Sequence, residues 1–178
     1  MTLRLRPLEP EDLDWLYSIE NDTALWDTSN TDIPYSRYAL RQYIAEQSSF
    51  HECGNLRLAI TLNHDADFSK AKNTCEPAPA IGLVDIMDFS PLHAHAEVGI
   101  TLFKQYRGCG YGTEALRQIC QIAKNRLHLH TLIAHVSISN ESSLRLFQCA
   151  GFQHIGTLKE WHCIDGIFVD AYLFQKIL

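Results

Sequence analysis

A glycine-rich turn at residues 105–112 constrains this chain more than any other feature of its sequence. The segment reads Gln-Tyr-Arg-Gly-Cys-Gly-Tyr-Gly and lies between an expected strand and an expected helix that begins near residue 111. Glycines remove side chains, so the backbone can approach a ligand closely and its N–H groups can converge on an anion. The positive end of the following helix strengthens such a site. We interpret the turn as a cradle for a pyrophosphate, with a plain tight turn before a helix as the alternative.

Known phosphate-binding motifs of other kinds do not fit this segment. No Gly-Lys-Ser/Thr follows it, so it is not a Walker A loop, and the spacing of its glycines differs from the dinucleotide-binding fingerprint. Arg107 supplies a planar cation and Thr113 a hydroxyl at the same place. The residues predicted to hold the phosphates are Arg107, Gly108, Cys109, Gly110, Tyr111, Gly112 and Thr113.

The pattern of apolar residues predicts an α/β domain with a mixed sheet. The expected strands are 2–6, 56–62, 80–88, 95–103, 130–137, 152–161 and 167–176, and the expected helices are 11–20, 37–47, 111–127 and 141–149. Residues 21–35 are interpreted as a loop, and residues 63–79 as a mobile surface loop. The length of 178 residues favours a single domain over residues 1–178.

The composition of the chain indicates which classes of ligand and which cellular location to expect. The longest apolar runs are too short for a membrane span, and we recognise no signal peptide, which favours a cytoplasmic protein. A net charge of −6 argues against nucleic acid and would attract a cationic substrate such as a polyamine, although mild acidity also simply favours solubility. The histidines and the six cysteines lack metal-ligand spacing, so we expect no metal and mostly reduced thiols.

Four segments together resemble the GCN5-related N-acetyltransferase (GNAT) family. Gln105-x-x-Gly108-x-Gly110 is similar to its pyrophosphate signature, and the stretch from Asn140 to Gly151-Phe152 is similar to its second CoA-side motif. Residues 5–13 and 96–100 resemble the branch that contains ribosomal-protein and spermidine acetyltransferases. The resemblance covers nearly the whole chain and implies a mostly antiparallel sheet of about seven strands flanked by about four helices.

The resemblance also implies a donor and its binding residues. Acetyl-CoA would be the cosubstrate, with Ile100, Thr101 and Leu102 pairing with the pantetheine arm, and with Asn140 and its helix lining the thiol end. In the polyamine enzymes of the family, the position that falls on Phe147 is a tyrosine that protonates the leaving thiolate. Phe147, which we also place at the donor site, has no hydroxyl, so another group or water must take that role. Dimers or larger rings are usual among such relatives, so a homo-oligomer is possible.

Amine acetylation requires a neutral amine, and a free alkylamine has a pKa of about 10.4. Glu97 is our predicted base, because it lies on the strand that leads to the turn, within an otherwise apolar stretch; its alternative is an outward-facing structural carboxylate. Asp85 is a candidate for an acidic wall around a cationic substrate. His135 and Ser137 are candidates for the missing hydroxyl, or else half-buried polar residues of their strand.

Trp26 and Tyr35 are predicted to cover the acceptor, since the resemblance places the acceptor-side lid in this aromatic-rich region; packing is their alternative role. The leading functional hypothesis is an N-acetyltransferase acting on a primary amine of a small molecule, with spermidine or a diamine first. Two alternatives stay open: an enzyme that acetylates protein N-termini, and a CoA-binding domain without catalysis.

Overall fold

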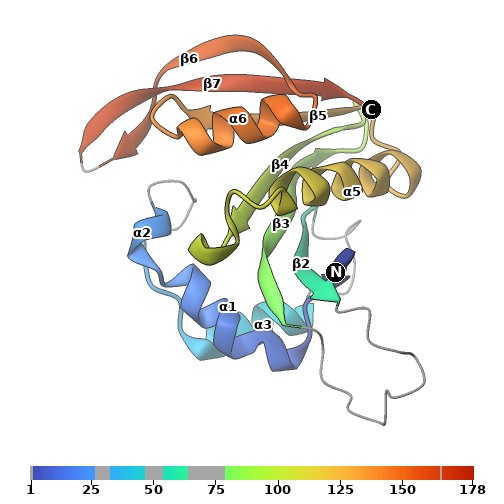
Figure 1. The fold of residues 1–178 in the computed structure, drawn as a ribbon, viewed down its shortest axis with the longest axis vertical. Coiled ribbons are helices and arrows are strands. Elements are labelled where there is room, and N and C mark those ends of the chain that lie inside the picture. The colour runs from blue at the N-terminus through green and yellow to red at the C-terminus, as the bar shows by residue number, and fades with distance from the viewer. Residues whose placement is uncertain (1, 27–32, 47–53, 64–78, 165) are drawn as a thin grey trace.

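The computed structural model describes residues 2–26, 33–46, 54–63, 79–164 and 166–178 (Figure 1). Most of the expected loop at 63–79 therefore lies outside the described residues. The described strands are β1 (Thr2–Pro7), β2 (Leu56–Asn63), β3 (Ala80–Ser90), β4 (His95–Leu102), β5 (Thr131–Ser137), β6 (Gln153–Ile164) and β7 (Ile167–Ile177). The described α-helices are α1 (Leu13–Glu20), α2 (Thr23–Trp26), α3 (Arg37–Glu46), α5 (Tyr111–Asn125) and α6 (Glu141–Cys149), with short 3-10 helices η1 (Pro10–Asp12) and η2 (Lys104–Tyr106).

All seven strands form one sheet in the order β1-β2-β3-β4-β5-β7-β6. Every pair in it is antiparallel except β4 with β5, which run parallel. The predicted fold class, a mixed and mostly antiparallel seven-stranded sheet with flanking helices, is therefore confirmed.

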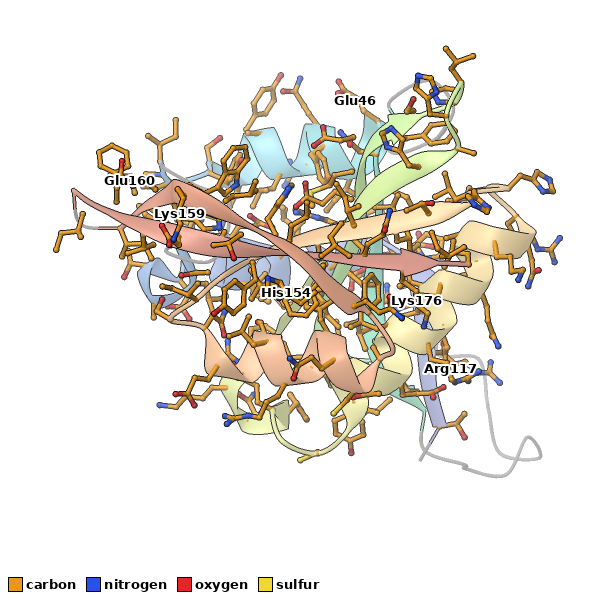
Figure 2. The ribbon with its side chains drawn as sticks, turned by 90° about the horizontal axis from the view of Figure 1, so that it is seen from above. Glu46, Arg117, His154, Lys159, Glu160 and Lys176 are labelled. Atoms are coloured by element: carbon orange, nitrogen blue, oxygen red, sulfur yellow. The ribbon has the colours of Figure 1, made fainter. Side chains whose placement is uncertain are left out.

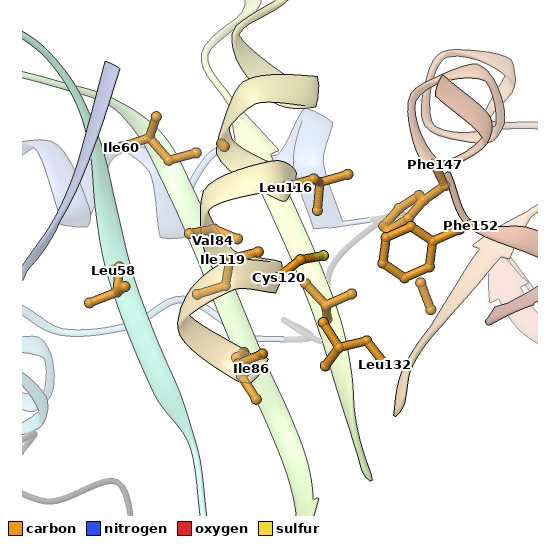
Figure 3. Packing of buried hydrophobic residues seen from close by; sticks show 14 of the residues in the cluster. Leu58, Ile60, Val84, Ile86, Leu116, Ile119, Cys120, Leu132, Phe147 and Phe152 are labelled. Atoms are coloured by element: carbon orange, nitrogen blue, oxygen red, sulfur yellow. The ribbon is translucent and has the colours of Figure 1, made fainter. Parts of the chain in front are cut away.

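Helices cover both faces of the sheet, as Figure 1 shows. Helix α5 places its apolar stripe, which includes Leu116, Ile119 and Ala123, on the face formed by Val84 and Val98 and their neighbours. Figure 3 shows Leu116 and Ile119 of this stripe with Val84 of the sheet. The spacing of these helical residues is that of a single buried face, so their burial follows directly from the 3.6-residue period. Helix α6 packs on the same side of the sheet.

The opposite face of the sheet is covered by α1 and α3. Leu16 and Leu40 from these helices are buried with Ala59 and Leu83 from β2 and β3. Because side chains alternate along a strand, Leu83 faces α1 and α3, whereas the next residue along the strand, Val84, faces α5. Each strand in the centre of the sheet thus presents one set of residues to each helical layer.

Two local predictions differ from the structure. Residues 23–26, which were assigned to a loop, form the short helix α2, in which Trp26 donates its Nε1–H to the carbonyl of Glu20 at 3.0 Å. The polar and aromatic composition of the segment did not indicate this four-residue helix. Strand β6 also continues to Ile164 rather than ending at residue 161, because it carries a bulge that is described below.

Candidate functional site

The glycine-rich turn joins β4 to α5 through η2 and has the backbone conformation that its glycines permit. Gly108 has φ of 75° and Gly110, the N-cap of α5, has φ of 83°, both in the left-handed region that side chains disfavour. A Cβ atom at either position would meet no atom within 4 Å, so the space beside both is open. Gly110 has no side chain to accept from the first turn of α5, which leaves that helix terminus available to an anion.

Arg107 is held at the mouth of this turn. Its Nε donates to the carbonyl of Leu102 at the end of β4, at 2.9 Å. Within the described residues its two terminal nitrogens have no hydrogen-bond partner, so they remain free to donate to phosphate oxygens. The residues present therefore fit a pyrophosphate: open glycines, an uncapped fifteen-residue helix and a fixed guanidinium.

Gly112 has a different role from the other two glycines of the turn. It is buried in α5, and a Cβ atom there would approach Leu146 of α6 to 3.1 Å and 3.2 Å. Its missing side chain thus permits close packing between α5 and α6. The predicted contact of Gly112 with the pyrophosphate stays a prediction, because packing against Leu146 does not test what its backbone N–H binds.

Strands β4 and β5 diverge after three residue pairs. The parallel pairing ends at Glu97 with Ile133, although β4 continues to Leu102 alongside β3, and β5 continues to Ser137 alongside β7. Alternate backbone groups of a strand point to each of its two sides. Within the described structure, the β5-facing backbone edge of Ile100 to Leu102 therefore has no strand beside it, and an extended ligand arm can pair with it.

Helix α6 packs beside the first turn of α5, where Leu146 approaches Gly112. The side-chain oxygen of Asn140 accepts from the backbone N–H of Ser143 at 3.1 Å and so caps the helix. Phe147 is only 4% exposed, and its ring packs against Phe152 and Phe174 with centroid distances of 5.1 Å and 6.1 Å. Figure 3 shows the contact between Phe147 and Phe152. The aromatic ring that replaces the expected tyrosine thus belongs to the core.

Glu97 and His135 meet on the face of the sheet opposite to α5. Ala96 and Val98 are buried under α5, so Glu97 between them projects to the other side. The Nδ1 atom of His135 on β5 lies 2.9 Å from Oε1 of Glu97, and the two side chains are 19% and 21% exposed. Two residues that sequence analysis considered separately thus form one hydrogen-bonded pair beside the point where the strands diverge.

A bulge in β6 lies near this pair. Leu158 pairs with Ala171 and His162 pairs with Val169, so three residues of β6 stand opposite a single residue of β7, Asp170. Bulges of this kind bend a strand and redirect side chains, and they recur next to active sites.

Asp170 fixes the shape of the bulge with both carboxylate oxygens. One accepts the backbone N–H of Glu160 at 2.9 Å and the other accepts from Lys159 at 2.7 Å, and these two donors lower the pKa of Asp170. Glu160 has φ of 51°, a left-handed conformation that the bulge requires. Figure 2 places Lys159 and Glu160 together on the β6–β7 hairpin. The next residue, Trp161, has its ring 5.5 Å from that of His135, a contact that the sequence did not indicate.

Asp85 lies on the same side of the sheet as Glu97 but has a cationic partner. Arg57 donates to its two carboxylate oxygens at 2.6 Å and 3.2 Å, and to Glu20 of α1 at 2.6 Å. Burial alone would lower the pKa of Arg57, but Asp85 and Glu20 outweigh that effect and raise it. Arg57 already neutralises part of the acidic wall that Asp85 was predicted to form.

A pocket of about 300 Å³ adjoins this cluster between α1, α3 and β2. Its lining includes Glu20, Tyr35, Tyr43, Glu46 and Arg57. Tyr35 is held there through Asn21, whose side chain accepts the Tyr35 backbone N–H at 2.8 Å and donates to its carbonyl at 3.1 Å.

Trp26 and Tyr35, the two predicted acceptor residues, thus both contact the C-terminal end of α1. Residues 27–32 between them are not described. Glu20, the partner of Trp26, is close to it in sequence, whereas Asn21, the partner of Tyr35, is not. The position of Tyr35 could therefore not be derived from a local pattern.

The described residues contain no group of three or more histidine, cysteine, aspartate or glutamate side chains that could hold a metal ion. In the same part of the chain, no helix is long and apolar enough to cross a membrane.

Comparison with known proteins places these features in a family. The family model for the acetyltransferase (GNAT) domain matches residues 2–153. The spermidine N(1)-acetyltransferase of Escherichia coli (strain K12) is 24% identical over 173 residues, which cover 96% of this chain and 83% of that protein.

Solved structures share the fold. A crystal structure of the spermidine N-acetyltransferase from Vibrio cholerae in complex with CoA and spermine superposes with a TM-score of 0.80 at 23% identity, over 98% of this chain and 95% of that chain. A dodecameric structure of the Vibrio cholerae enzyme gives a TM-score of 0.74 at 24% identity, over 98% and 93% of the two chains.

Proposed function

This chain belongs to the GNAT acetyltransferase family, and from that premise we propose that it transfers the acetyl group of acetyl-CoA to a primary amine of a polyamine such as spermidine or a diamine. One observation carries the proposal: the divergence of β4 from β5 joins an open, uncapped helix terminus on one side to the Glu97–His135 pair on the other. An extended thioester donor and an amine acceptor can approach this gap from opposite faces of the sheet.

The donor side is assigned to residues that fit the parts of acetyl-CoA. Arg107 and the open glycines, Gly108 and Gly110, would hold the pyrophosphate, and the edge of residues 100–102 that has no strand beside it would pair with the pantetheine arm. Acetyl-CoA supplies an activated acyl carbon and a thiolate leaving group. The chain itself contributes positioning, which is worth a large effective concentration, and N–H donors near the reacting carbonyl.

The acceptor side is assigned to the opposite face of the sheet. Glu97 and His135 would take the proton that an alkylammonium must lose before it can attack. A polyamine suits the net charge of −6 and the carboxylates Glu20 and Glu46 that line the pocket near Arg57. The relatives that act on spermidine support the same acceptor class.

The decisive assay measures CoA release with a thiol reagent against a panel of acceptors. We expect turnover with spermidine, spermine, putrescine or cadaverine, and much less with peptides that carry a free N-terminus. Turnover with peptides alone would replace this proposal with N-terminal acetylation. Acetyl-CoA binding without turnover of any acceptor would indicate a binding domain without catalysis.

The donor site has its own test with a matched pair of variants. Gly110→Ala and Gly54→Ala both place a side chain at a left-handed φ, 83° and 69°, with no atom within 4 Å. Each variant should lose a similar stability, about 1–2 kcal/mol. We expect only Gly110→Ala to weaken acetyl-CoA binding in calorimetric titration, and equal binding by the two would contradict the site.

Acetyl-CoA at about 100 times its dissociation constant should stabilise the wild-type protein by about 2.7 kcal/mol. This corresponds to a rise in Tm of roughly 5–10 °C for a chain of this length. A Tm that does not respond to millimolar acetyl-CoA would remove the donor from the proposal.

The proposal includes a cytoplasmic location and a homo-oligomer. The dodecameric Vibrio cholerae relative supports the oligomer, and light scattering after size-exclusion chromatography measures it directly. Cell fractionation tests the location.

A further inference from the structure

The contact between Glu97 and His135 assigns a direction to the imidazole ring. A carboxylate can only accept a hydrogen bond, so the Nδ1 atom of His135, 2.9 Å from Oε1 of Glu97, must carry a proton. In a neutral imidazole the other nitrogen, Nε2, then holds a lone pair. Within the described residues Nε2 has no hydrogen-bond partner, and the side chain is 19% exposed. The ring is therefore oriented with an unoccupied proton acceptor.

Glu97 and His135 occupy different positions relative to the point where β4 and β5 diverge. Glu97 pairs with Ile133 in the last residue pair before β4 and β5 diverge. His135 is the next residue on the same face of β5, and it lies beyond that last pair, alongside Leu173 of β7. His135 therefore stands on the diverging part of the strand, where the gap opens, whereas Glu97 stays on the paired part.

The ring of His135 is surrounded by side chains from β4, β6 and β7. Among the described residues, Glu97 from β4 is hydrogen-bonded to it, and His162 from β6 lies close enough to interact with its charge. Burial and the nearby His135 lower the pKa of His162, and Glu97 opposes them. Trp161 covers part of the ring, and the neighbour on β7, Leu173, is apolar.

We propose that Nε2 of His135, rather than the carboxylate of Glu97, takes the proton from the acceptor ammonium, and that Glu97 is a positioning residue that fixes the ring through Nδ1. This inference rests on the proposed function and assigns separate roles to Glu97 and His135. It also differs from the sequence interpretation, in which Glu97 was the base and His135 a candidate for the missing acid.

One N–H bond of the ammonium breaks, its proton moves to Nε2, and its electron pair stays on the amine nitrogen. The amine then forms a C–N bond with the thioester carbonyl carbon as the C–S bond breaks. The second proton released by the nitrogen neutralises the thiolate through solvent, since Phe147 cannot donate one. His135 returns its proton to water, and one proton is released per turnover.

The test compares pH profiles of kcat/KM for spermidine in the full-length enzyme. With a base of the imidazole type, the wild-type profile should rise and then level off near or above neutrality. His135→Asn keeps an N–H that can donate to Glu97 but removes Nε2. We expect this variant to lose about 100-fold at pH 7 and to keep rising with a slope of one toward the pKa of the amine, because only pre-formed neutral amine then reacts.

Glu97→Gln should behave differently, because its side-chain oxygen still accepts from Nδ1. The imidazole base is retained in this variant, so the profile should still level off. If Glu97 is instead the base, Glu97→Gln will show the unlimited rise and His135→Asn will still level off. That reversal would overturn the assignment.

Matched measurements separate a structural effect from a chemical one. His130→Gln changes an exposed histidine at the residue before β5 and should leave the profile unchanged. His135→Asn should bind acetyl-CoA as the wild type does. If the His135→Asn variant does not fold, the same pH profile is measured with His135→Gln. The wild-type profile is a further test, because a wild-type rate that rises with unit slope to the pKa of the amine also contradicts the proposal. A wild-type enzyme that turns over no amine would contradict the proposed function itself, which is a distinct outcome.

Discussion

Gly82→Ala should damage the donor site by moving the end of β4. Gly82 of β3 pairs with Leu102, and a Cβ atom at residue 82 would lie 2.2 Å from the carbonyl oxygen of Thr101 and 2.7 Å from a methyl group of Leu102. The first distance is about 1.2 Å shorter than the 3.4 Å at which ordinary contact begins. A backbone oxygen cannot rotate away as a side chain can, so the strand itself must shift.

The magnitude follows from this overlap. Overpacking of a core typically costs about 1–3 kcal/mol, and a clash with backbone belongs at the upper end of that range. For a chain of this length, the loss corresponds to a decrease in Tm of roughly 4–12 °C. A shift of about 1 Å in residues 100–102 should also lower kcat/KM for acetyl-CoA by up to about 100-fold.

The assay combines thermal unfolding with steady-state kinetics at saturating acceptor. Gly156→Ala is the matched control, since Gly156 lies in β6 and a Cβ atom there would meet nothing within 4 Å. Its stability should stay within about 0.5 kcal/mol of wild type. If Gly82→Ala unfolds at the wild-type temperature and retains its kinetics with acetyl-CoA, the close approach of β3 to β4 and the role of residues 100–102 are both refuted.

Further predictions concern three side chains that fix local geometry. The pKa of Asp12, which burial alone would raise, is instead lowered, chiefly by hydrogen bonds from Arg6 at 2.6 Å and 2.8 Å, so this group stabilises the fold above the unfolded pKa of about 4 and less as pH falls through the folded value. Asp12→Asn should cost about 2 kcal/mol in urea unfolding at pH 7 and reduce the loss of stability on acidification. Asn140→Ala removes the cap of α6 and should cost about 0.5–2 kcal/mol in the same assay. Asp170→Asn should loosen the bulge and displace Trp161, which we expect to raise KM for spermidine and to change tryptophan fluorescence.

Each of these predictions has a contrary outcome. An acid-unfolding midpoint for Asp12→Asn that equals the wild-type value would exclude the ion pair as the source of acid sensitivity. A cap variant at Asn140 with unchanged stability would mean that water replaces the side chain. Unchanged fluorescence and KM after Asp170→Asn would separate the bulge from the acceptor site.

The sequence by itself determined the elements whose causes are local. The period of α5, the N-cap of α6 and the glycines before α5 each depend on residues within a few positions of one another. All seven strands were predicted close to their observed bounds, and the resemblance implied a mostly antiparallel sheet of about seven strands. The donor turn was therefore visible in the sequence before any tertiary contact was known.

Tertiary structure alone decided which polar side chains share a site. Glu97 and His135 are 38 residues apart and meet only because β4 and β5 are adjacent and parallel at that point. Asp85 is hydrogen-bonded to Arg57, which lies on the neighbouring strand β2. Trp161 contacts His135 because β6 carries a bulge, which the alternation of residues in the sequence does not indicate. Strand pairing sets such contacts through register, and register depends on the whole sheet rather than on any one segment. The donor side of this protein thus depends on residues close together in sequence, whereas its proton-transfer side is formed only when the strands of the sheet pair.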